Sequence, residues 1–238
     1  MVCYYSKCIF DKKYFTAMAF AYSSFISYRH NDIEDAYFIN LKNFLQPSLF
    51  RATDFTEIFY DKETIEWGKK WDDDIYKGIE ESLFFLPLWY DLYLSEKNIW
   101  CAKELYHALQ VEKAIKEKLA PADKDNFFFI FPLIFLGSAD LIPDCLSKKQ
   151  AKSLVGFELT IKTKKLSNKF QDLITDVYNT LHKHFRILEK YPAINFHDEF
   201  EKIKRPTDDE IKNWVKEQRK IITEKESKQL PVLGKSGE

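Results

Sequence analysis

The chain has 238 residues, of which 45% are hydrophobic and 31% are charged, a balance typical of a globular protein and not of a disordered one. Its 36 basic and 37 acidic residues leave a net charge of −1, which gives no support to binding of nucleic acid. The four cysteines follow neither a disulfide framework nor a metal-ligand spacing, so we expect free thiols in a reducing cytoplasm; they are Cys3, Cys8, Cys101 and Cys145.

Two apolar stretches resemble membrane or export signals. Phe127 to Leu136 (FFFIFPLIFL) is only about half as long as a membrane span, and a buried parallel strand explains it better. Lys12 and Lys13 precede an apolar stretch that faintly resembles a signal peptide, but cleavage there would leave the next strand at a raw terminus. We therefore expect neither a membrane span nor export.

Strand-like and helical patterns alternate from the N-terminus onward. The predicted strands are Ala19–Tyr28, Glu57–Tyr60, Phe84–Trp89, Phe127–Leu136 and Phe157–Lys162. The predicted helices are one from about Asp32, then Asp72–Leu83, Ile99–Glu117 and Asn168–Leu188. Because proline has no N–H to donate, Pro132 argues against the second half of the fourth strand as a central ladder member.

This order predicts an α/β fold, a flavodoxin-like three-layer sandwich with a mostly parallel five-stranded sheet. Ligands of such sheets gather outside the carboxyl ends of the strands, which draws attention to the loops after Tyr28, Tyr60 and Trp89.

We predict one domain over residues 15–190 and a C-terminal helical extension with a flexible tail over residues 191–238. Thr207 to Glu210 matches a capping box, and an apolar stripe follows it. This last helix either packs on the domain or presents its stripe to a partner.

Several common enzyme motifs are missing. The six glycines form neither a dinucleotide-binding G-x-G-x-x-G nor a P-loop, and no G-x-S-x-G nucleophile elbow occurs. His182 and His184 are two residues apart, so they lie on different faces of a helix and make poor metal ligands. We therefore expect no metal site, and neither a hydride-transfer enzyme nor a P-loop NTPase.

Three segments at loop-facing positions resemble the boxes of the Toll/interleukin-1 receptor (TIR) domain family. They are FISYRHND from Phe25, FYD ending at Asp61 with a Gly in the following loop, and Y-L-S-x(4)-W-C-x-x-E-L from Tyr93 to Leu105. The resemblance covers about residues 20–150, with fair agreement to 190. Its W-x-x-x-E spacing, Trp100 to Glu104, resembles the catalytically active bacterial members. A Trp stands at position 67, where the family frequently has Pro, and this leaves the assembly geometry open.

The resemblance implies cleavage of NAD into nicotinamide and either ADP-ribose or a cyclic ADP-ribose isomer, in bacterial antiphage defence. Glu104 would be the catalytic residue, NAD the substrate, and no further cofactor would be needed. The positions expected to bind the nucleotide are Phe25, Ser27, Tyr28, Arg29, Asp61 and Trp100. Family members also associate with one another, so self-association and a separate effector or sensor protein are expected partners.

Other interpretations stand beside this one. Glu104 on an amphipathic helix would ordinarily be a solvated charge, Phe25 a core residue, and Arg29 a partner of Asp32. The whole chain could act as a non-catalytic TIR–TIR scaffold, or as a sensor that binds a nucleotide without cleaving it. The sequence distinguishes neither a hydrolase from a cyclase nor NAD from NADP.

Overall fold

A five-stranded sheet forms the centre of the molecule. The computed structural model describes residues 20–29, 32–53, 55, 57–59, 71–97, 99–137, 142–147, 149, 151–156 and 168–229, without the side chains of residues 32–36 and 71. The strands are β1 (Ser24–Ser27), β2 (Ile58–Phe59), β3 (Phe85–Trp89), β4 (Leu133–Ile134) and β5 (Lys152–Ser153). They pair in the order β2-β1-β3-β4-β5, and every pair is parallel. This is the predicted flavodoxin-like order, with shorter strands than the apolar runs suggested.

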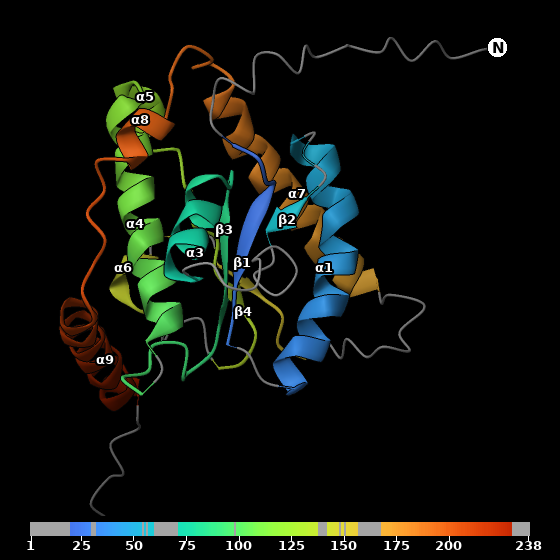
Figure 1. Cartoon of the computed structure of the whole chain (residues 1–238). Helices are drawn as coiled ribbons and strands as arrows, with labels where there is room; N and C mark the ends of the chain where they lie inside the picture. The colour runs from blue at the N-terminus through green and yellow to red at the C-terminus, as the bar shows by residue number, and fades with distance from the viewer. Residues whose placement is uncertain are drawn as a thin grey trace, which may run out of the picture.

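Helices cover both faces of the sheet and complete three layers. Their bounds are α1 (Asp32–Thr53), α3 (Trp71–Glu80), α4 (Trp100–Lys118), α5 (Pro121–Lys124), α6 (Asp144–Ser147), α7 (Asn168–Leu188), α8 (His197–Phe200) and α9 (Asp208–Gln229). Helices α1 and α7 pack together on one face, and α3 and α4 lie on the other (Figure 1). The predicted helices are confirmed, α7 with its predicted bounds.

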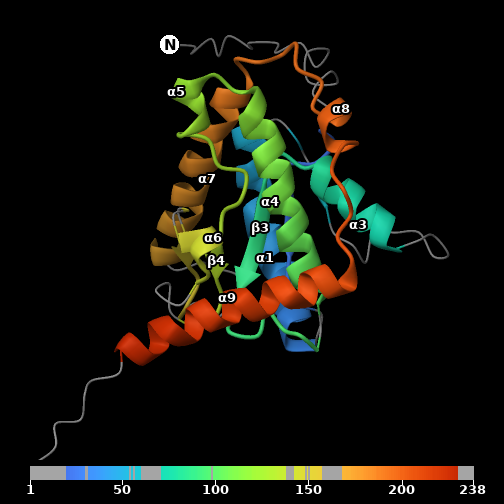
Figure 2. The ribbon, with the colours of Figure 1, turned by 90° about the vertical axis from the view of Figure 1, so that its left-hand side faces the viewer.

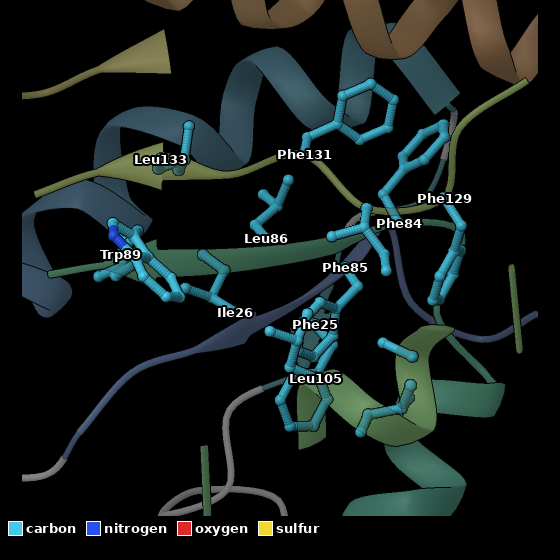
Figure 3. Packing of buried hydrophobic residues seen from close by; sticks show 14 of the residues in the cluster. Phe25, Ile26, Phe84, Phe85, Leu86, Trp89, Leu105, Phe129, Phe131 and Leu133 are labelled. Atoms are coloured by element: carbon cyan, nitrogen blue, oxygen red, sulfur yellow. The ribbon is translucent and has the colours of Figure 1, made fainter. Parts of the chain in front are cut away.

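The core between the sheet and α4 is built on a row of stacked rings. Phe25 on β1 pairs in register with Phe59 on β2 and with Phe85 on β3. Because paired residues of neighbouring strands face the same side, the three rings stack, with centroids 5.0 and 5.6 Å from that of Phe25. Leu105 of α4 lies against this row, as Figure 3 shows. Packing of this row fixes the position of α4 relative to strands β2, β1 and β3.

The prediction about Pro132 was wrong. Leu133 and Ile134, which follow the proline, pair with β3 on one side and with β5 on the other. Backbone N–H groups alternate between the two neighbours along a strand, and Phe131 donates to Phe85 on the β3 side. The N–H that Pro132 lacks would therefore point toward β5. Pairing with β5 begins only at Leu133, so the proline removes no hydrogen bond from within the β4–β5 ladder. The predicted strand at residues 157–162 lies outside the described residues.

The C-terminal helix α9 packs on the domain. Its start has the predicted capping box, in which the Thr207 N–H donates to the Glu210 carboxylate at 2.7 Å and the Glu210 N–H to the Thr207 hydroxyl at 3.3 Å. Ile211 and Val215 are fully buried. Figure 2 shows α9 crossing the N-terminal end of α4 near the tip of β3. The predicted domain boundary at residue 190 stays a prediction.

Within the part of the chain described above, no helix combines the length and the apolar character needed to cross a lipid bilayer.

Candidate active site

Three side chains from different elements meet where β1 and β3 end. Ser27 is the last residue of β1, Tyr93 lies in the turn after β3, and Glu104 lies in the second turn of α4. All three are buried, and only 6% of Glu104 is exposed to solvent. A carboxylate on the outer half of an amphipathic helix would face water, so this glutamate is turned toward the sheet and not away from it.

A chain of hydrogen bonds joins the three residues. The Ser27 hydroxyl donates to Oε2 of Glu104, and the Tyr93 hydroxyl is also in hydrogen-bond contact with Ser27 Oγ. A serine hydroxyl has a single proton, and Ser27 gives it to the carboxylate. Tyr93 must therefore donate to Ser27. The order of donation runs from tyrosine to serine to glutamate.

Tyr93 stays a donor at neutral pH. Burial raises the pKa of its phenol well above the usual value, and the negative charges that Cys101 and Glu104 can carry raise it further, against a smaller opposing effect of the Ser27 hydrogen bond. The neutral phenol keeps its proton for Ser27, which keeps the order of donation fixed.

The start of α4 also contacts α9. The Lys103 ammonium lies 4.3 Å from the ring centroid of Trp100 and 2.7 Å from the carboxylate of Asp208, in the first turn of α9. The hydrogen bond from Lys103 lowers the pKa of Asp208. Trp100 itself is half-buried, one helical turn before Glu104. The first turns of α4 and α9 are therefore held together next to the carboxylate.

A second polar cluster lies farther along α4. The buried His107 lies 2.9 Å from the Glu80 carboxylate, which Arg205 also reaches at 3.0 Å. Burial lowers the pKa of His107, against the opposing effect of Glu80, so the neutral ring is favoured. Arg205 also lies over the ring of Tyr76, 4.4 Å from its centroid. This cluster anchors the segment before α9 to α3 and α4.

The remaining predicted site residues differ in their surroundings. Phe25 is buried in the row of rings, Tyr28 is buried and stacks on Phe38 with centroids 4.3 Å apart, and Arg29 is half-buried. Asp61 lies outside the described residues. Cys101 is a buried thiol, as expected of a small apolar residue.

Two of the hollows on the described surface are not lined by Glu104. One of about 130 Å³ lies between the end of β3 and α9, where Arg219 donates to the Leu94 carbonyl at 3.0 Å. The other, of about 350 Å³, lies between α4 and the segment from Glu199 to Pro206. Among the described residues, no group of three potential metal ligands occurs.

The sequence did not reveal the role of Tyr93. This residue begins the Y-L-S pattern, but its hydroxyl meets a serine 66 positions earlier in the chain. Only the pairing of β1 with β3 brings the two side chains together.

Residues 25–132 match the family model described as the TIR domain. The matched span begins within β1, ends just before β4, and contains Ser27, Tyr93 and Glu104. No curated protein matches the chain.

Proposed function

This chain carries a TIR domain, and from that premise we propose that it cleaves the nicotinamide–ribose bond of NAD, with Glu104 as the catalytic carboxylate. The observation that supports the proposal is the placement of Glu104, which is buried at the carboxyl end of β1 and accepts a hydrogen bond from Ser27. Ligands of parallel sheets of this order bind at that edge.

The reaction suits a single carboxylate. Nicotinamide is positively charged within NAD, and it departs as a neutral pyridine that takes the electron pair of the broken bond, so the leaving group needs no general acid. The ribose carbon then develops oxocarbenium character, as in other glycoside cleavages. A preorganised carboxylate stabilises that positive charge without having to reorient. Addition of water gives ADP-ribose and a proton, whereas attack by an adenine nitrogen gives a cyclic isomer.

We also propose the cellular setting that the family resemblance implied. The protein would act in the cytoplasm as part of an antiphage response, either depleting NAD or producing a nucleotide signal. TIR domains commonly self-associate. Association of several copies, with or without a separate sensor protein, would then control turnover.

The test is nicotinamide release from NAD by the purified full chain at high protein concentration. Glu104→Gln, which keeps the size of the side chain, should lower the rate by on the order of 10²–10³, the scale for one electrostatic stabiliser. Glu117→Gln is a matched control, because Glu117 lies exposed on the same helix, and it should leave the rate unchanged. Full activity in Glu104→Gln would remove this residue from the mechanism.

Additional measurements on the same purified protein separate the alternatives. No turnover by an assembled wild-type protein, together with retention of a TIR-containing partner, would favour the scaffold. Calorimetric binding of NAD without product would favour a sensor. The mass of the product distinguishes hydrolysis from cyclisation.

A further inference from the structure

We infer that Tyr93 is a positioning residue for Glu104 and that it acts through the hydroxyl of Ser27. The inference rests on the proposed function, since it concerns the carboxylate assigned to the reaction. It adds a residue that does not touch the substrate, and it explains why a buried tyrosine lies in the turn after β3.

The single proton of the Ser27 hydroxyl sets the direction of the hydrogen bonds. Ser27 has one hydroxyl proton and two acceptor positions, and its proton goes to Glu104. The carboxylate orients this hydroxyl, and a donor to the serine oxygen restricts its rotation further. The Tyr93 hydroxyl is that donor, so it holds the Ser27 proton in the direction of the carboxylate.

Tyr93 is held rigidly by its surroundings. The residue is 1% exposed, and its ring centroid lies 5.3 Å from that of Trp89 at the end of β3. Its backbone N–H donates to the Tyr90 carbonyl at 2.9 Å, which closes the turn. The next residue, Leu94, has its carbonyl bound by Arg219 of α9. Both the ring and the backbone of Tyr93 are therefore fixed relative to the sheet.

The hydrogen-bond chain connects Glu104 to the sheet. This residue belongs to α4, whereas Ser27 and Tyr93 belong to β1 and to the turn after β3. The hydrogen-bond chain thus fixes one carboxylate oxygen of α4 against the sheet. Catalysis by a fixed charge depends on orientation before the reaction begins, so a loosened carboxylate stabilises the ribosyl cation less well.

The experiment compares Tyr93→Phe, Ser27→Ala and the double variant in the full chain. Tyr93→Phe removes only an oxygen, and we expect kcat to fall by about three- to tenfold, the range for loss of one hydrogen bond, with little change in KM. The double variant should be no slower than Ser27→Ala alone, because both changes break the same chain. Tyr37→Phe is the control: the Tyr37 hydroxyl is buried and makes no hydrogen bond with any described residue, so kcat should not change.

A second readout does not require turnover. In a cycle of Tyr93→Phe and Ser27→Ala, the unfolding equilibrium constant at one urea concentration should show non-additive effects of at least about threefold, because the two side chains are in contact. Additive effects would overturn the inference, and so would an unchanged kcat in Tyr93→Phe of an enzyme that depends on Glu104. An enzyme that does not need Glu104 would instead overturn the proposed function.

Discussion

The contact between Gly78 and Phe59 gives a sharp test of the packing around β1. Gly78 lies on α3, and a Cβ placed there would be 2.4, 2.6 and 2.7 Å from three carbons of the Phe59 ring. These distances are well inside van der Waals contact. The ring cannot move aside easily, because it stacks on Phe25 at 5.0 Å and meets Tyr22 edge-on at 5.2 Å. We therefore expect Gly78→Ala to destabilise the protein.

Two effects oppose each other in this substitution. Alanine is better than glycine inside a helix by about 1 kcal/mol. Overpacking of a core typically costs about 1–3 kcal/mol, and three close contacts with a held ring place this site at the upper end. The net loss should be about 2 kcal/mol, which lowers Tm by about 4–8 °C for a chain of this size.

The assay is urea unfolding of wild type, Gly78→Ala, Phe59→Leu and the double variant. Phe59→Leu destabilises by itself, but it makes room beside position 78. In that background Gly78→Ala should become stabilising by up to about 1 kcal/mol, because helix propensity then dominates. Stabilisation by Gly78→Ala in the wild-type background would refute the tight approach of α3 to β2.

Two further predictions concern ionisable side chains buried in the core. The carboxylate of Glu112 accepts hydrogen bonds from the N–H groups of Phe129 and Ile130 at 2.9 and 3.1 Å, and it pairs with the buried Lys149. Burial favours its neutral form. The charges of Lys149 and Lys116 and the hydrogen bonds outweigh burial and lower the pKa of Glu112. Glu112→Gln leaves Lys149 buried and uncompensated, at a cost on the order of 3 kcal/mol by urea unfolding; adding Lys149→Met should recover part of that loss, and no recovery would contradict the pairing. Burial lowers the pKa of His184 to about 4, so its neutral form is favoured in the folded state, and stability should fall as pH drops from 7 to 5, where only the unfolded histidine takes up a proton. His184 should account for on the order of 1–2 kcal/mol of the loss in free energy of unfolding between pH 7 and pH 5. His184→Leu should reduce the loss by that amount. An unchanged pH dependence of stability in this variant would show that the ring is not buried in its neutral form.

The order of elements followed from the sequence because each one has a local cause. Helical spacing of apolar residues and short β-rich runs mark α7 and β3 without reference to the rest of the chain. The capping box at Thr207 likewise depends only on residues three apart.

Details that depend on distant residues did not follow. The apolar run from Phe127 to Leu136 is hydrophobic throughout, so the sequence could not show that only Leu133 and Ile134 pair on both sides. The direction of the Pro132 nitrogen depends on the register with β3 and β5. The link from Tyr93 to Ser27 needs the β1–β3 register, and the pair of Lys103 and Asp208 needs α9 to cross α4.

The matched span of residues 25–132 is not a suitable fragment for expression. Such a polypeptide would lack α7, so Phe44 of α1 would lose its edge-on partner Phe170, with ring centroids 5.8 Å apart. It would also lack α9, which exposes the surface of α4 where Trp214 meets Tyr106 at 5.4 Å. Large bare apolar surfaces promote aggregation. An insoluble or inactive fragment of this kind would therefore reflect the loss of packing by α7 and α9. It would say nothing about the chemistry of Glu104.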